Sequence, residues 1–342
     1  MYKRIMVPLD GSERAEKALP VAARIARASS GIVILAQVAA LPVTYTSYTM
    51  AAYAGDAIDE ELHSIESYLN DLSKRGVLQG VKTETKVLFG SAAPTLLSIA
   101  TSCNADLIVM TSHGRTGLKR WVLGSVAQKI ARTSPVPVLV LRENGIMPVT
   151  SAAGSRALRA LVTLDGSVIA KAALEPAAYL VSALSAPGKG ELHLLRVVKP
   201  PTHLSLPADV SLETWKQQAL HKAKAYMTSV VEHLREGPLA ALHLVITWSV
   251  VMDDDVAGAI VRFAESGEDA EGAGMSTRCD LLAMATHGYT GLQYWVLGSI
   301  TERVLGSTRV PMLVVRPSEM PTPKYVVDGT SMSFEETVLT NR

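Results

Sequence analysis

The stretch HGRTGLKRWVLGS at residues 113–125 returns as HGYTGLQYWVLGS at residues 287–299, with ten of the thirteen positions identical. A shorter block, DGS, occurs at residues 10–12 and again at residues 165–167, and alanine and leucine follow it at the same offsets in both places. Because the two blocks recur in the same order, the chain contains one structural unit written twice.

Within each copy, apolar runs typical of buried strands alternate with stretches of helical periodicity. Continuous apolar strands separated by helices indicate a parallel sheet covered on both faces. We therefore predict an α/β fold with two tandem doubly wound, mostly parallel five-stranded sheets and helices on both faces. In the first copy we expect strands at 4–9, 32–38, 81–88, 107–110 and 136–141, and helices at 13–28, 56–74, 93–101 and 125–133.

The duplication predicts a first domain at residues 1–143, a linker at 144–156, a second domain at 157–317 and a C-terminal tail at 318–342. The composition, 48% hydrophobic but 5% aromatic, suits helices packed on a sheet. A net charge of +1 argues against nucleic acid or an anionic membrane as partner. We expect neither a signal peptide nor a membrane-spanning run from this sequence, and therefore expect a cytoplasmic protein.

An aspartate ends the first strand of each copy, Asp10 in the first and Asp165 in the second. Doubly wound sheets bind ligands at the carboxyl ends of their strands, where such a carboxylate can accept hydrogen bonds from a ribose hydroxyl or an adenine amine. The alternative is structural: Asp10 and Ser12 are residue types that cap a following helix well.

A glycine and a serine open a helix later in each copy, as Gly124-Ser125 and Gly298-Ser299. Unpaired amides and the positive end of the helix dipole make such a helix start a natural phosphate cradle. The alternative is that Ser125 is only an N-cap and that Gly114 and Gly117 only shape a turn. Since both loops recur at the same end of both predicted sheets, we favour a binding site.

These motifs make the chain similar to the universal stress protein family over nearly all of both copies. That family carries a glycine, two residues, a second glycine, nine residues, and then glycine followed by serine or threonine. The resemblance implies a Rossmann-like fold that binds ATP, with Mg²⁺ as an accompanying ion left open. The adenine-nucleotide site that it implies comprises Asp10, Val38, Met110, Thr111, Gly114, Gly124, Ser125 and Val126, and in the second copy Asp165, Val197, Met284, Ala285, Gly288, Gly298, Ser299 and Ile300.

Two departures make the two copies unequal. Thr111 and Ala285 stand where the family has its first glycine, and a Cβ there takes room from a ligand. In addition, we match the Gly90-Ser91-Ala92 loop of the first copy with residues 250–252 of the second, where no glycine occurs.

No catalytic or metal-binding residue is predicted. The chain lacks the GxxxxGK[ST] motif of P-loop enzymes and the GxSxG nucleophile elbow, so we expect His113 and His287 to organise turns. Three successive aspartates at 253–255 are expected to favour a helix N-terminus, not a metal.

The family commonly dimerises through its last strand, so the resemblance implies that the strands at 136–141 and 311–315 lie side by side as a built-in pseudo-dimer. Further association of two chains is left open. The predicted function is an ATP-binding stress-response or signalling protein with little or no catalysis. The alternatives are a structural or interaction protein of the same fold without nucleotide, and a slow ATPase.

Overall fold

A computed structural model describes residues 2–39, 51–112, 123–142, 147, 157–201, 211–267, 278–286 and 297–317. The first half contains β1 (Arg4–Leu9), α1 (Glu13–Glu16), α2 (Leu19–Ser29), β2 (Ile32–Ala39), α3 (Ala51–Ser73), β3 (Lys82–Phe89), α4 (Ala92–Ser102), β4 (Leu107–Thr111), α5 (Ser125–Thr133) and β5 (Val138–Leu141). The second half repeats this order with β6 (Arg159–Thr163), α6 (Leu174–Ser185), β7 (Glu191–Val198), α7 (Leu212–Glu236), β8 (Val245–Met252), α8 (Val256–Ser266), β9 (Leu281–Ala285), α9 (Ser299–Ser307) and β10 (Met312–Val315).

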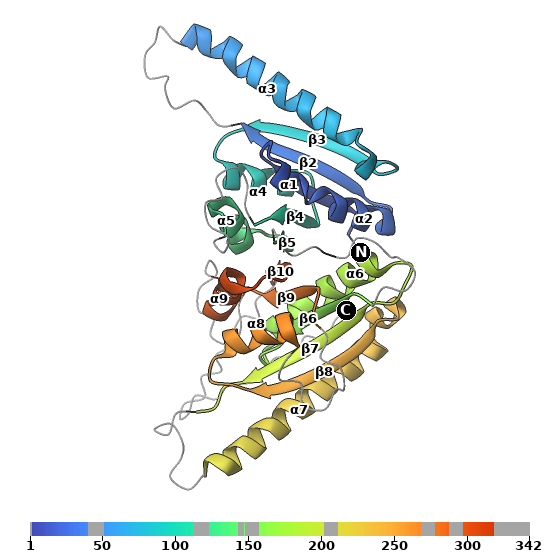
Figure 1. The fold of residues 1–342 in the computed structure, drawn as a ribbon, viewed down its shortest axis with the longest axis vertical. Coiled ribbons are helices and arrows are strands. Elements are labelled where there is room, and N and C mark those ends of the chain that lie inside the picture. Colours follow the sequence, from blue (N-terminus) through green and yellow to red (C-terminus); the bar gives the residue numbers. More distant parts are fainter. Residues whose placement is uncertain are drawn as a thin grey trace, which may run out of the picture.

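The strands form one sheet of ten in the order β3-β2-β1-β4-β5-β10-β9-β6-β7-β8. All pairs within a half are parallel, whereas β5 and β10 pair antiparallel, with Leu139 opposite Leu313. The expected side-by-side placement of the last strands is therefore present, and it joins the two predicted five-stranded sheets into one. An unpaired apolar edge strand is a template for another strand, so the two five-stranded edges close on each other. Figure 1 shows this seam at mid-height, with α3 and α7 at opposite ends of the molecule.

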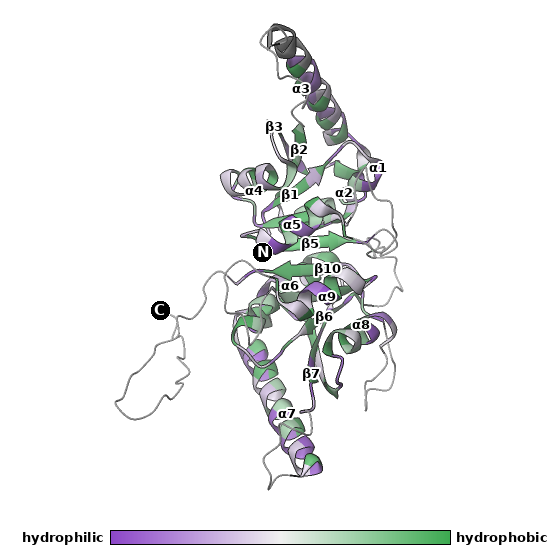
Figure 2. Cartoon of the chain, turned by 90° about the vertical axis from the view of Figure 1, so that its left-hand side faces the viewer, coloured by the Kyte–Doolittle hydropathy of each residue, from purple (hydrophilic) through white to green (hydrophobic). Residues whose placement is uncertain are grey.

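Helices cover both faces of the sheet, as predicted. One apolar core lies under α2, α3, α6 and α7, and the other lies under α4, α5, α8 and α9. Alternate residues of β1 enter the two cores, Ile5 and Val7 on one face and Met6 on the other. Figure 2 shows the apolar central strands between these layers, with β5 and β10 running in opposite directions.

The helix expected at 13–28 is interrupted, and a proline explains why. α1 ends at Glu16, and α2 begins at Leu19 with Pro20 in its first turn. Proline has no amide hydrogen, so it cannot donate to the carbonyl of Glu16 and a continuous helix would lose that bond. The second half has the same break, a 3₁₀ turn at Ile169–Ala173 followed by α6 with Pro176 near its start.

Candidate functional site

The aspartate loops have the same geometry in both halves. Asp10 Oδ1 accepts hydrogen bonds from the amide of Ser12 (3.0 Å) and from its hydroxyl (2.6 Å), and Ser12 Oγ accepts from the amide of Ala15. In the second half, Asp165 Oδ1 accepts from the amide of Ser167 at 2.9 Å. The turn needs a glycine, because Gly11 has φ +80 and Gly166 has φ +94. The capping role considered for this loop is thus real for Ser12, and it fixes the carboxylate at the strand end.

Glycine, not serine, is the N-cap of each of the two site helices. Gly124 (φ −61, ψ 147) precedes α5 and Gly298 (φ −58, ψ 143) precedes α9, and no side chain caps either helix. The amide of Gly124 donates to the carbonyl of Ser112 at 2.8 Å, and that of Gly298 donates to Thr286 at 2.6 Å. The alternative in which Ser125 is the N-cap is therefore wrong. Both helix starts present backbone amides without a capping side chain.

A cavity lies between the aspartate loop and the glycine-capped helix in each half. It measures ≈ 230 Å³ in the first half and ≈ 210 Å³ in the second. Its wall includes fourteen of the sixteen residues expected from the sequence: Asp10, Val38, Met110, Thr111, Gly124, Ser125 and Val126 in the first half, and Asp165, Val197, Met284, Ala285, Gly298, Ser299 and Ile300 in the second. Gly114 and Gly288 lie outside the described residues, as do His113 and His287.

Several wall residues were not expected from the sequence. Leu96 of α4 and Ile260 of α8 line the first and second cavities, and Ala15 and Ala170 line them from the helix after the aspartate loop. Leu96 and Ile260 carry no sequence signal beyond the apolar face of a helix, which also describes every core residue. Ala15 and Ala170 follow the repeated DGS block at the same offset. An apolar wall with a few converging polar groups is the usual make-up of a small-molecule site.

The loop after β3 has a different counterpart in the second half from the one expected. The amide of Gly90 bonds the carbonyl of Ala39, and the amide of Asp253 bonds Val198 in the same way. Residues 250–252 lie within β8, so Gly90 and Ser91 correspond to the aspartates at 253–255. Matching by sequence failed because an alignment without conserved residues has no anchor between the blocks.

Asp255 confirms the expected role of the acidic run at a helix start. It is the N-cap of α8 and its carboxylate accepts a hydrogen bond from the amide of Gly258. That bond, with Arg303 beside it, holds the pKa of Asp255 below its usual value. Both carboxylate oxygens also receive guanidinium nitrogens of Arg303 from α9, at 2.7 and 2.9 Å.

The two halves also differ next to the aspartate loop, on the sheet face covered by α3 and α7. In the first half a hollow of ≈ 650 Å³ opens between Asp10 and α3, with Gln37, Glu60 and Tyr68 in its wall. In the second half Arg196 occupies the position of Gln37. Its guanidinium carbon lies 5.0 Å from the ring centroid of Tyr226, and its nitrogens lie against Gly166.

Within the described residues, no group of three or more His, Cys, Asp and Glu is arranged to hold a metal ion. Cys103 and Cys279 are both buried and form no disulfide with each other. None of the described helices is both long and apolar enough to cross a membrane.

The comparisons agree with this architecture. A model of the universal stress protein family matches residues 1–142 and 158–316. A universal stress protein of Staphylococcus aureus (strain USA300) is 33% identical over 143 residues, which are 41% of this chain and 84% of that protein. A crystal structure of a universal stress protein from Pseudomonas aeruginosa UCBPP-PA14 (17% identity, TM-score 0.57) covers 93% of this chain and 94% of its own. One from Archaeoglobus fulgidus DSM 4304 (20% identity, TM-score 0.57) covers 92% of this chain and 98% of its own. At these identities the two structures support the fold alone.

Proposed function

Because this chain belongs to the universal stress protein family, we propose that it binds an adenine nucleotide, expected to be ATP, in each half. It would act as a stress-response or signalling protein with little or no catalysis. One observation carries the proposal: in both halves an aspartate at a strand end and a glycine-capped helix start face the same cavity. A chain that needed these residues only for folding would have no reason to leave a cavity between them twice.

In the proposed complex the phosphates lie at the amides of Ser125 and Val126, where the helix dipole favours negative charge. The ribose hydroxyls donate to Asp10, and the adenine lies against Val38 and Met110. Their counterparts in the second half line the other cavity in the same way. Any accompanying Mg²⁺ would be held by the phosphates, because the described residues supply no metal cluster.

The direct test is to purify the chain, denature it and identify released nucleotide by chromatography. One or two equivalents of adenine nucleotide are expected. If none is released, and millimolar ATP does not raise the melting temperature, the proposal is wrong.

A double substitution, Gly124→Val with Gly298→Val, tests the residues. Valine readily adopts the backbone angles found at both positions, so the fold is expected to persist. Its branched side chain would stand between the helix amides and the phosphates, and nucleotide retention should be lost. Gly306→Val is the matched control, because a Cβ at this position in the last turn of α9 meets no atom within 4 Å. Retention unchanged in the double variant would show that the loops are wrongly assigned.

The second candidate function, an interaction protein without nucleotide, is favoured by the Thr111 side chain in the wall of the first cavity. The same release experiment separates the two candidates. A phosphate-release assay on the purified chain tests the slow ATPase.

A further inference from the structure

The walls of the two cavities are built from corresponding residues, but the charged residues near their proposed phosphate ends differ. Val256, the first residue of α8, lines the second cavity, and Ala92, the first residue of α4, lines the first. The residue before each is the helix N-cap, which is Asp255 in the second half and Ser91 in the first. A carboxylate therefore stands in the second half where the first half has a hydroxyl.

The two halves carry a cation at corresponding positions of α5 and α9, and the two cations differ in their side-chain partners. Lys129 and Arg303 are each the fifth residue of the site helix, one turn beyond Ser125 and Ser299. Arg303 is held by Asp255 through two charge-assisted bonds. Lys129 is exposed, and none of the described residues pairs with it. A phosphate chain can recruit Lys129, whereas recruiting Arg303 would break a bidentate pair and leave Asp255 facing the phosphates.

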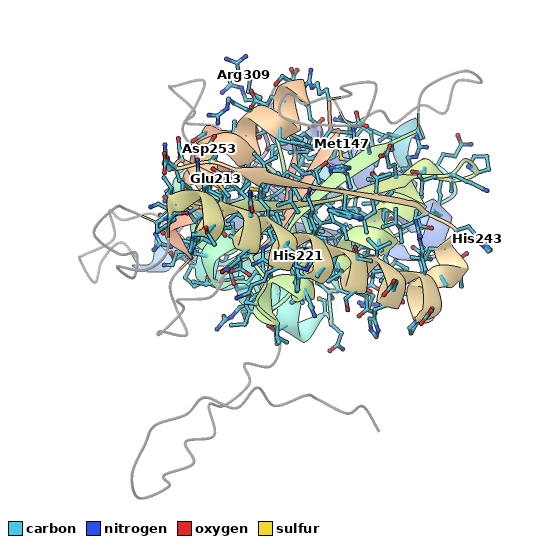
Figure 3. All side chains as sticks on the ribbon, turned by 90° about the horizontal axis from the view of Figure 1, so that it is seen from below. Met147, Glu213, His221, His243, Asp253 and Arg309 are labelled. Carbon is cyan, nitrogen blue, oxygen red and sulfur yellow. The ribbon has the colours of Figure 1, made fainter. Side chains whose placement is uncertain are left out.

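The neighbouring charges strengthen this contrast. The loop before α8 carries three aspartates, of which Asp253 pairs with Arg262 of the same helix. The corresponding loop before α4 contains Gly90 and Ser91 and no acid. Figure 3 labels Asp253 at the end of β8 opposite His243, the end at which the cavity opens. Arg196 is engaged elsewhere in the second half, because its guanidinium group stacks on Tyr226 next to Gly166 of the aspartate loop.

We propose that the two sites select adenine ligands by phosphate charge. The first-half cavity takes the nucleoside di- or triphosphate, and the second-half cavity takes an adenine ligand with at most one phosphate. Ser91 with Lys129, and Asp255 with Arg303, are the residues that set this preference. The inference rests on the proposed nucleotide binding and assigns a ligand class to each half.

The ligand affinity of each site can be measured separately in a variant whose other site is blocked. The Gly298→Val variant keeps the first-half site, and the Gly124→Val variant keeps the second. Calorimetric titration of each with ATP and with AMP gives the ratio of the two dissociation constants. ATP is expected to bind the first-half site at least about tenfold tighter than AMP, and to bind the second-half site no tighter than AMP.

A reciprocal exchange locates the preference. Asp255→Ser in the Gly124→Val background is expected to create a preference for ATP, and Ser91→Asp in the Gly298→Val background is expected to reduce one. Serine and aspartate are both good N-caps, so neither change should unfold its helix, which circular dichroism verifies. Asp253→Ser is the control: it removes the same charge but leaves Arg303 paired, so it should shift the ratio by about twofold or less.

The outcomes separate the two proposals. If neither ligand binds the unmodified chain, nucleotide binding itself is wrong. If both ligands bind both single-site variants with equal ratios, or if the exchanges leave the ratios unchanged, only the charge selection is overturned. A shift from Asp253→Ser as large as that from Asp255→Ser would overturn the role given to Arg303.

Discussion

His193 on β7 should make the stability of the second half sensitive to mild acid. Its side chain is 1% exposed, its Nδ1 lies 2.9 Å from a guanidinium nitrogen of Arg159, and its ring stacks on Phe263. Because arginine can only donate, Nδ1 accepts this bond and the neutral ring carries its proton on Nε2. Burial, and then the charge of Arg159, lower the pKa of His193 to about 3.

The sign follows from proton binding in the two states. The unfolded chain takes up a proton on this residue near pH 6.5, whereas the folded chain does not until about pH 3. Stability from this residue is therefore complete above pH 6.5 and decreases as the pH falls toward 3. With about 1.4 kcal/mol per pH unit, its loss at pH 5 is about 2 kcal/mol.

His193→Ile is the perturbation, since Ile34 holds the equivalent position on β2 and is fully buried. Thr247 donates to Glu191 at 2.9 Å and Arg159 pairs with the same carboxylate, and both contacts are expected to persist in this variant. Urea denaturation at pH 7, 6 and 5 gives the free energy of unfolding for both proteins. The unmodified chain should lose about 2 kcal/mol more than the variant between pH 7 and 5. Parallel pH profiles would refute the reasoning, because the other histidines are common to both proteins.

Two further predictions concern the seam and the first-half site. Leu313→Ala should lower the free energy of unfolding in urea by about 2–5 kcal/mol, because this fully buried side chain lies opposite Leu139 between the halves. A loss below about 1 kcal/mol would mean that neighbouring side chains move in to fill the space left by the leucine. Asp10→Asn in the Gly298→Val background should weaken ATP binding about tenfold by calorimetry, since a charged acceptor becomes neutral. Asp59→Asn on α3 makes the same exchange outside the cavity wall and should change nothing; equal effects would point to net charge alone.

Most of the fold could be predicted because its determinants are local or repeated. The apolar runs at β1 and β4 and the periodic pattern of α5 were each sufficient to place their elements within a residue. What failed depended on a single backbone group, because Pro20 breaks a helix whose apolar spacing continues through it. The pairing of β5 with a strand about 170 residues away has no local signal, and it was expected only from the duplication and the family resemblance.

The candidate site was predictable for the residues that its motifs contain. Asp10 directly follows β1, Gly124 opens the helix after β4, and parallel strands deliver their carboxyl ends to one edge. The residues that distinguish the halves could not be found in this way. In the sequence Arg303 was one of 33 lysines and arginines, and only its distance to Asp255 shows that its guanidinium group is held in an ion pair.

Tandem fusion explains how such differences can exist. In a dimer of two identical chains, every substitution enters both sites, so the sites remain equal. Here one chain supplies both β5 and β10, and the seam between them joins two halves that can change independently. At the cavities and beneath them the halves differ at three matched positions: Ser91 against Asp255, Gln37 against Arg196, and Ile34 against His193. The strand order, the aspartate loops and the glycine N-caps of the site helices are the same in both halves. A fold kept constant while charged contacts around two cavities diverge is what two sites with different ligands require.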